Sequence, residues 1–468
     1  MGMTITEKIL ANAAGHDKVK PGENIWVNAN VLMTHDVCGP GTIGVFQREF
    51  GKDAKVWDKE GVVIIPDHYI FTEDKTCHRN VDTLREFVKE QDLPYFYDPA
   101  DETYSGVCHV TLPEKGHIRP GEVLFGTDSH TCTHGALGMF ATGIGNTDAG
   151  FVMGTGKLLI KIPPTIKFVI NGIFPKGVIA KDVILKIIGD IGVDGATYCA
   201  MEFAGTAIEA LSVEERMTIC NMSIEGGARC GYINPDQITF DYLESRPYSP
   251  KGESWDKAVE DWKALASAED ADYDDEMTFT AADIGPTVTW GINPGQGITI
   301  DQKIPLVDDL APELQNSARE ALEYMDFQEG QLIEGTPVDV VFIGSCTNGR
   351  LSDLQEAANV LKGHTVAPGV TALCVPGSQI VAVQAEKLGL DKIFTEAGFQ
   401  WRQAGCSMCL AMNPDKLVGR QLCASTSNRN FKGRQGSPTG RTILLSPIMA
   451  AAAAVEGKIS DARKVFFN

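Results

Sequence analysis

Three cysteines stand where their thiolates could bind a metal. Cys406 and Cys409 form the chain's one CxxC pair, and Cys346 follows the apolar run Val338–Ile343 in the sequence GSCTNG. That run predicts a buried strand, and ligands bind at the carboxyl ends of strands in α/β sheets. A zinc finger needs a second ligand pair, which the chain lacks. Three thiolates on an iron–sulfur cluster would leave one iron open as a Lewis acid, but spacing alone leaves buried structural thiols as the alternative.

Histidines beside carboxylates form a second candidate group. The chain has nine histidines in total. Acids favour the protonated imidazole, so several such pairs indicate a site for an anionic substrate that exchanges protons. His130 and His134 lack the glutamate of a zinc-protease motif. The segments are Asp67-His68, Cys108-His109 and Asp128-Ser129-His130, with Glu225 as a further acid.

Arg429, Arg434 and Arg441 crowd one segment of an otherwise acidic chain. Arginine binds carboxylates through two parallel N–H groups, so the segment indicates a local pocket for an anion, with an ordinary surface loop as the alternative. Lys and Arg number 41 against 62 Asp and Glu, which gives a formal charge of −21. This charge argues against a general binder of nucleic acid or of anionic membranes.

The amino-terminal segment has no apolar core of a signal peptide, and no stretch approaches 18 consecutive apolar residues. We therefore expect a cytoplasmic protein that does not insert into membranes. Its 12 cysteines are then expected to be reduced, and most of them to be small buried hydrophobic residues.

The strands and helices that must position these residues are predicted to form an α/β fold. Apolar strand-like runs alternate with segments of helical spacing, and 468 residues suggest about three domains. We predict boundaries that give domains 1–163, 164–284 and 285–468. The acidic, Pro- and Gly-flanked segment 249–283 is interpreted as a solvated helix and loop that joins domains. Strands are predicted at Ile25–Met33, Gly61–Pro66, Val123–Phe125 and Thr165–Ile170, and a helix with a capping box at Ser212.

One glycine motif offers a competing function. Gly39 to Gly44 matches G-x-G-x-x-G, and Asp67 lies near the place of a ribose-binding acid, as in a nicotinamide oxidoreductase. Its glycines, however, begin five residues after the predicted strand rather than at its tip. Tight NADH binding would support this alternative.

Five separated motifs together resemble the aconitase family. They are GTDSHT at 126–131, MTICNMSIE at 217–225, GSCTNG at 344–349, GCSMC at 405–409 and SNRNFKGR at 427–434. The resemblance implies three α/β/α domains packed around an iron–sulfur cluster, without the swivelling fourth domain. Within the family, the tail GRQGSPTGRTILLSPIMAAAAA is similar to the branch that isomerises 2-isopropylmalate to 3-isopropylmalate in leucine biosynthesis. That reaction proceeds by dehydration and rehydration. The alternative is a homoaconitase or another 2-alkylmalate hydro-lyase of the family.

The resemblance also implies roles for individual residues. Cys346, Cys406 and Cys409 would hold one 4Fe-4S cluster per chain. The acid–base pairs would be Asp67 with His68, His109 with Asp128, and His130 with Glu225. Substrate-binding residues would be His35, Ser129, Arg429 and Arg434, and residues beside the cluster would be Asn221 and Asn428.

The family's base is a serine on the swivelling domain, and the matched motifs contain no free candidate for it. The chain ends at Asn468, after a predicted helix Ile459–Val465. We therefore expect a small subunit that carries the serine and pairs with this chain as a heterodimer around a small dicarboxylate substrate. A family relative that binds RNA is the non-enzymatic alternative, and the charge of −21 argues against it.

Overall fold

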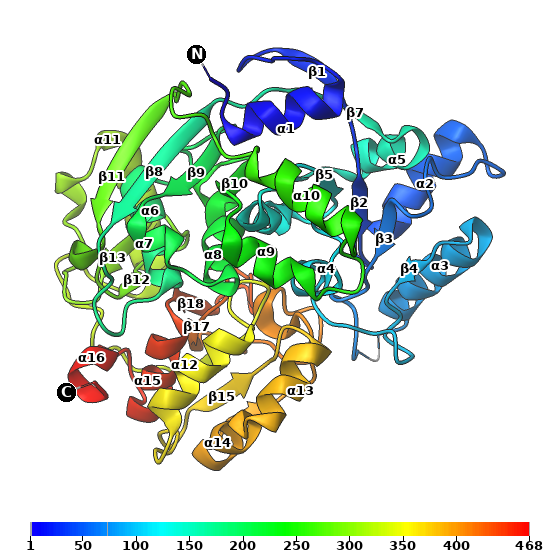
Figure 1. Ribbon diagram of the computed structural model, residues 1–468. Helices are drawn as coiled ribbons and strands as arrows, with labels where there is room; N and C mark the ends of the chain where they lie inside the picture. Colours follow the sequence, from blue (N-terminus) through cyan, green and yellow to red (C-terminus); the bar gives the residue numbers. More distant parts are fainter. Residues whose placement is uncertain (1, 73, 468) are drawn as a thin grey trace. The chain divides into compact units, whose positions relative to one another are not determined.

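The structure is a computed structural model that describes residues 2–72 and 74–467. The chain divides into two compact units. Unit 1 comprises Met1–Asn171 and Ala196–Phe279, and unit 2 comprises Gly172–Gly195 and Thr280–Asn468. The expected α/β class is confirmed, because each unit contains a five-stranded parallel sheet with helices between its strands (Figure 1). The predicted boundaries after residues 163 and 284 divide the chain more finely and stay a prediction.

The five-stranded sheet of unit 1 has the order β4-β3-β2-β5-β6, and all neighbouring strands are parallel. Every residue of β2, β3 and β5 is buried. Such continuous apolar runs are typical of parallel strands that are covered on both faces. The strands are β2 (Val31–Thr34), β3 (Val62–Ile64), β4 (Tyr95–Phe96), β5 (Val123–Gly126) and β6 (Phe140–Gly143).

The sheet of unit 2 repeats this topology. Its order is β16-β15-β14-β17-β18, again with parallel neighbours. Numbered along the chain within each sheet, both orders read 3-2-1-4-5. The strand order therefore reverses beside β2 in unit 1 and beside β14 in unit 2, which is where ligands bind in open parallel sheets. The strands are β14 (Val340–Ile343), β15 (Thr371–Cys374), β16 (Gln400–Trp401), β17 (Leu422–Ser425) and β18 (Arg441–Leu444).

A third sheet, of order β10-β9-β8-β11, belongs to unit 1. Its strands are β8 (Thr165–Asn171), β9 (Ala200–Ala204), β10 (Cys230–Ile233) and β11 (Asp275–Thr280). The last of these corrects the interpretation of 249–283 as helix and loop alone: α10 (Glu253–Lys263) is a helix, but the acidic end of the segment is an edge strand. Its alternating exposure allows acidic side chains to face water.

The single strand predicted at Ile25–Met33 is two strands in different sheets. β1 (Asn24–Asn28) pairs antiparallel with β7 (Lys157–Lys161), and β2 enters the centre of the five-stranded sheet. Two smaller strands, β12 (Thr287–Thr289) and β13 (Gly297–Thr299), form an antiparallel pair in unit 2. The closing helix is also shorter than predicted, since α16 spans Ala462–Val465.

Helices connect the strands and carry several site residues. The capping box predicted at Ser212 is present, because Ser212 and Glu215 exchange hydrogen bonds at the start of α8. Among the described residues, no helix is long and apolar enough to cross a membrane. The α-helices of unit 1 are α1 (Ile5–Ala14), α2 (Gly39–Phe50), α3 (Lys75–Gln91), α4 (Cys108–Lys115), α5 (Asn146–Thr155), α7 (Thr206–Glu209), α8 (Val213–Asn221), α9 (Gln237–Glu244) and α10. Those of unit 2 are α6 (Ala180–Ile191), α11 (Pro312–Met325), α12 (Leu351–Leu361), α13 (Gln379–Lys387), α14 (Leu390–Ala397), α15 (Pro447–Glu456) and α16.

The glycine motif does not form a phosphate-binding turn. Gly39 to Gly44 lies inside the first turns of α2, and four residues separate Gly39 from the end of β2. A dinucleotide site needs these glycines in the turn between strand and helix, so the structure gives the oxidoreductase alternative no support.

Candidate active site

The carboxyl ends of three neighbouring strands in unit 1 carry the predicted histidines and acids. His35 follows β2, Asp67 and His68 follow β3, and Asp128 follows β5. Because β2 lies between β3 and β5, these loops meet at the point where the strand order reverses. Residues that are distant in sequence are thereby gathered at one edge of one sheet.

Asp67 and His68 form a tightly hydrogen-bonded pair. His68 Nδ1 lies 2.6 Å from Asp67 Oδ1, and the other carboxylate oxygen of Asp67 accepts the backbone N–H of Cys108 at 2.8 Å. Burial alone would lower the pKa of His68, but the Asp67 carboxylate outweighs it and raises that pKa to about 9. His68 is therefore a protonated imidazole at neutral pH, with a proton to donate.

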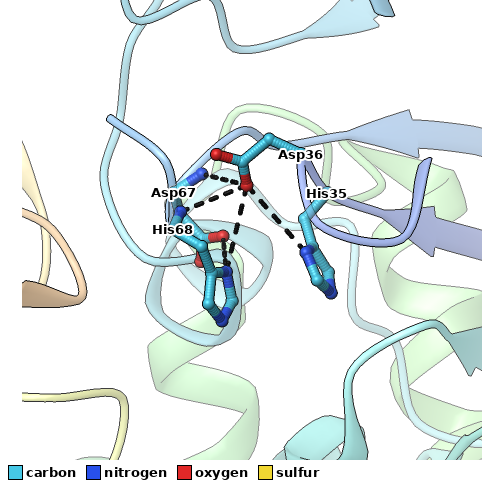
Figure 2. A group of neighbouring side chains, drawn as sticks. All are labelled: His35, Asp36, Asp67 and His68. Atoms are coloured by element: carbon cyan, nitrogen blue, oxygen red, sulfur yellow. Dashed lines mark hydrogen bonds and ion pairs between the residues drawn. The ribbon is translucent and has the colours of Figure 1, made fainter. Parts of the chain in front are cut away.

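Asp36, which belongs to no predicted site motif, holds the His68 loop in place. Its buried carboxylate accepts the backbone N–H groups of Asp67 at 3.2 Å and His68 at 3.1 Å (Figure 2). It also accepts the backbone N–H of Tyr69. It lies 3.9 Å from His68 Nδ1. One carboxylate thus fixes three successive amides of a loop more than 30 residues away. Its position directly after His35 was the one available signal.

His35 is held in its neutral form against His68. The two rings stack with centroids 4.5 Å apart. Burial, and then the nearby His68 cation, lower the pKa of His35. Its Nδ1 accepts the backbone N–H of Val37 at 3.3 Å, so the ring proton sits on Nε2. That buried Nε2 contacts no acceptor among the described residues, which leaves an N–H group available to a ligand.

His35, Asp36, Asp67 and His68 also have the composition of a metal site. One ligand atom from each lies within 4.8 Å of the others. Both carboxylates, however, already accept backbone N–H groups, and Asp67 binds His68 directly. The hydrogen bonds therefore favour a proton-transfer group over a metal site (Figure 2).

A second network joins the other two predicted pairs. Asp128 Oδ1 lies 2.8 Å from His109 Nε2 and accepts the backbone N–H of His130 at 2.7 Å. His130 Nε2 lies 2.9 Å from Glu225 Oε1. Burial opposes ionisation of Asp128, but its hydrogen bonds from His109 and His130 hold the pKa of Asp128 well below its ordinary value. Asp128 is thus a carboxylate at any physiological pH.

The remaining predicted residues of unit 1 lie beside this network. Ser129 Oγ is 3.5 Å from His130 Nδ1, and Asn221 Nδ2 donates to Thr133 Oγ1 at 2.8 Å. His134, which is not among the predicted site residues, has Nε2 3.2 Å from His109 Nδ1. Contact with both Asp128 and His134 fixes the orientation of the His109 ring.

In unit 2, the loop after β14 holds Cys346 in an unusual backbone. Cys346 is buried, and Ser345 before it has φ 77°. Ser407, between the other two predicted ligands, has φ 48°. Non-glycine residues with positive φ are strained, and they concentrate at functional sites. Cys406 and Cys409 are joined by a disulfide and pack in one apolar cluster with Val340 and Phe342 of β14.

Asn428, on the loop after β17, bonds directly to the Cys346 loop. Its Nδ2 donates to Cys346 Sγ at 3.2 Å and to Thr347 Oγ1 at 3.0 Å. The buried ammonium of Lys181, from α6, donates to the carbonyls of Thr426 at 2.8 Å and Ser427 at 2.7 Å. Lys181 therefore fixes the backbone directly before Asn428, a role that no sequence motif indicated.

The two predicted arginines belong to the same loop as Asn428. Arg429 follows Asn428, and its carbonyl accepts the hydroxyl of Ser427 at 3.3 Å. The Arg434 guanidinium lies over the ring of Phe431, 5.5 Å from its centroid. Both side chains are half-buried, as expected of residues that bind a ligand from solvent.

Unit 2 has the donor chemistry of an iron–sulfur site. It supplies buried cysteine sulfurs on two strained loops, as the thiol of Cys346 and the disulfide of Cys406 and Cys409, and an amide N–H directed at the Cys346 sulfur. Cysteine thiolates and hydrogen bonds to sulfur are what such clusters require. The residues present therefore fit the predicted cofactor.

Comparison with known proteins decides the family. The model of the aconitase family (aconitate hydratase) matches residues 7–457. The chain belongs to the aconitase family. The motifs that suggested this resemblance all lie inside the matched range.

Curated aconitase-family relatives are similar over nearly their whole length. The chain is 51% identical over 442 residues to the 3-isopropylmalate dehydratase large subunit of Sorangium cellulosum, covering 93% of each protein. It is 52% identical over 442 residues to the protein of the same name from Opitutus terrae, again with 93% of each covered. The crystal structure of Thermococcus kodakaraensis aconitase X covers 86% of the chain at 13% identity, with a TM-score of 0.46.

Proposed function

We propose that this aconitase-family chain is the large subunit of an enzyme that isomerises 2-isopropylmalate to 3-isopropylmalate in leucine biosynthesis, by removing water and adding it back. The observation that carries the proposal is the set of three histidine–carboxylate contacts, two buried and one partly buried, in a chain whose relatives are named 3-isopropylmalate dehydratase large subunit. A homoaconitase would use the same groups with a different side-chain pocket, and substrate comparison separates the two.

Cys346, Cys406 and Cys409 are the residues that would hold the cofactor, one 4Fe-4S cluster per chain. Binding requires the disulfide between Cys406 and Cys409 to be reduced, because thiolates are the ligands. The bound cluster supplies an open iron that acts as a Lewis acid on the C–O bond of the substrate. Asn428 donates to the Cys346 sulfur, and Lys181 holds the backbone that positions Asn428.

The histidine–carboxylate pairs act on the hydroxyl that leaves. Hydroxide is a poor leaving group, and protonated His68 donates its Nε2 proton to the departing hydroxyl. Asp67 keeps His68 protonated, and Asp36 fixes its backbone. The Asp128 carboxylate, held by His109 and by the backbone N–H of His130, accepts hydrogen bonds from water and from the substrate hydroxyl beside it.

Substrate carboxylates bind to the half-buried arginines. Arg429 and Arg434 each present a planar fork that matches a carboxylate. The N–H group at Nε2 of neutral His35 and the hydroxyl of Ser129 donate hydrogen bonds to substrate oxygens. A dicarboxylic 2-alkylmalate satisfies these donors.

A small subunit completes the enzyme. The relatives are named large subunits, which implies such a partner. The proton on carbon must be taken by a base, and the described histidines of this chain's site already contact carboxylates or other histidines. We expect the small subunit to contribute a serine as that base and to help select the alkyl group.

Anaerobic reconstitution tests the proposal. The chain is reduced with excess dithiol, which is oxidised as it cleaves the disulfide between Cys406 and Cys409. It is then reconstituted with iron and sulfide, mixed with its small subunit and assayed with 2-isopropylmalate, homocitrate and citrate. Turnover of 2-isopropylmalate that saturates near one small subunit per chain is expected, with no turnover by the chain alone. Substantial turnover by the large chain alone would show that the base lies within it.

Cysteine variants test the cofactor ligands separately. Cys346→Ser, Cys406→Ser and Cys409→Ser should each abolish the brown absorption of the cluster. Cys423→Ser is the matched control, because Cys423 is buried in the same apolar cluster as Cys406 and Cys409. A full cluster in Cys406→Ser would remove that residue from the ligand set.

A further inference from the structure

Arg350 is a buried arginine whose guanidinium forms no ion pair among the described residues, although its backbone N–H donates to the Asp353 carboxylate at 3.0 Å. It directly precedes α12, four residues after Cys346, and is 1% exposed. Its Nη1 donates to the carbonyl of Thr347. Nε and Nη2 share the other edge of the guanidinium, and neither contacts an acceptor among the described residues. A buried charge with unfilled donors is strongly unfavourable, so this edge requires an acceptor that residues 2–72 and 74–467 do not supply.

Arg216 shows that this fold can satisfy a buried arginine. Arg216 is as buried as Arg350, and its Nη1 and Nη2 donate to the two carboxylate oxygens of Asp236 at 2.7 and 2.6 Å. Its Nε donates to the carbonyl of Leu211 at 3.0 Å. Every edge of that guanidinium has an acceptor. The two arginines therefore differ in partners and not in burial, which makes Arg216 a matched control.

The surroundings of Arg350 connect it to Cys346. The side chain of Thr347, whose carbonyl binds Arg350, accepts a hydrogen bond from Asn428, and the same amide group donates to Cys346 Sγ. Arg350 is thus bonded to the residue next to one proposed cofactor ligand and shares its hydrogen-bonded loop.

The degree of burial indicates what kind of acceptor is missing. The exposed fraction of Arg350 is comparable to the 6%, 4% and 3% of Cys346, Cys406 and Cys409. A group that enters from solvent at each turnover needs donors that solvent can reach. Donors that are as inaccessible to solvent as the three cysteines instead bind a group that stays in the protein.

We propose that Arg350 is the counter-cation of the anionic cofactor held by Cys346, and that its open edge donates to sulfur of that cofactor. The inference rests on the proposed function. Three thiolates and the sulfides of a cluster give the group net negative charge, and its sulfurs accept N–H hydrogen bonds. The positive charge of Arg350 then favours the reduced, more negative state of the cluster.

The consequence differs between the empty and the loaded protein. Without the cofactor, Arg350 is an unpaired buried charge, so replacing it with an apolar residue should not lower stability. With the cofactor, the same replacement removes a favourable charge and two donors. A purely structural arginine behaves in the opposite way in the empty protein.

Arg350→Met and Arg216→Met are therefore compared in two measurements. The first is the urea midpoint of the cofactor-free chain, and the second is the reduction potential and iron content of the reconstituted chain. For Arg350→Met we expect an unchanged or higher midpoint, a lower potential and faster loss of iron in air. For Arg216→Met we expect a lower midpoint and an unchanged potential. Arg350→Lys, which keeps the charge, should restore most of the potential.

Three results would overturn the inference. A fall in urea midpoint for Arg350→Met like that of Arg216→Met would make Arg350 a structural residue. A potential and iron content equal to those of the unmodified chain would remove it from the cofactor's surroundings. A raised KM for 2-isopropylmalate at unchanged potential would assign the open edge to a substrate carboxylate. Failure of the unmodified chain to take up iron and sulfide would instead overturn the proposed function itself.

Discussion

Replacing Asp67 by asparagine should abolish the protonated state of His68 at neutral and mildly alkaline pH. The pKa of His68 is about 9 in the folded chain against an ordinary value of 6.5, and the Asp67 carboxylate at 2.6 Å is the principal group that raises it. Asparagine keeps the size of the side chain but removes the charge. Burial then dominates, and the pKa of His68 should fall to 6.5 or below.

The size of the effect follows from these two values. At about pH 8, a group of pKa 9 is roughly 90% protonated and one of pKa 6.5 roughly 3%, so the proton-donating form should decrease about 30-fold. The shift corresponds to roughly 3 kcal/mol of interaction between His68 and its surroundings. Because the pKa is higher in the folded than in the unfolded chain, this stabilisation is complete below pH 6.5 and disappears as the pH rises through about 9.

The titration is measured by NMR on protein labelled with carbon-13 at its nine histidines. The signal of His68 is assigned by its loss in His68→Gln. Asp98→Asn is the control, since Asp98 pairs with Arg85 and not with a histidine. If His68 in Asp67→Asn were still protonated at pH 8, the carboxylate would not be the cause of the raised pKa, and the proton donor would need another explanation.

Three further perturbations test how the site is supported. Gly135→Ala should lower the free energy of unfolding by about 3 kcal/mol or more, because the added methyl group would overlap the carbonyl oxygen of Gly231. Gly44→Ala is the control: the added methyl group has open space in helix α2, so the free energy of unfolding should rise by about 0.5–1 kcal/mol. Urea unfolding compares the two variants. Asp36→Asn should cost about 2 kcal/mol and speed amide hydrogen exchange at His68, and unchanged exchange there would show that the loop is held by other contacts. Lys181→Met leaves two buried carbonyls without their donor, so a loss of about 2–4 kcal/mol in thermal unfolding is expected, and a smaller loss would mean that other donors replace it.

What the sequence alone could predict was mostly local. Asp67 and His68 are adjacent in sequence, and the short apolar run before them marks the end of a strand. Their contact could therefore be predicted from a single loop. The pairing of His130 with Glu225 spans 95 residues and was available only through the family resemblance. Alternation of apolar and polar residues indicated a strand at Ile25–Met33, but it cannot tell which sheet a strand joins. The break into β1 and β2 was therefore missed.

The residues that sequence reasoning missed act through the backbone. Asp36 accepts main-chain amides of a distant loop, and Lys181 donates to main-chain carbonyls. Such contacts require no particular partner side chain, so they leave no paired motif in the sequence. Arg350 was missed for a related reason. A basic residue at a predicted helix start is normally interpreted as a surface residue, and only the structure shows that Arg350 is buried.

Unit 2 is built from two separate stretches of the chain, so its parts are synthesised at different times. Helix α6 is made early, between two parts of unit 1, yet its buried Lys181 bonds to carbonyls 245 and 246 residues later in the sequence. At about 5–20 residues per second, a ribosome needs roughly 12–50 s to make that stretch. Throughout this interval the ammonium of Lys181 lacks its permanent partners in the loop after β17. During synthesis, α6 must therefore stay accessible until the loop after β17 has been made. A fragment that starts at residue 280 lacks Lys181, the residue that holds its Asn428 loop.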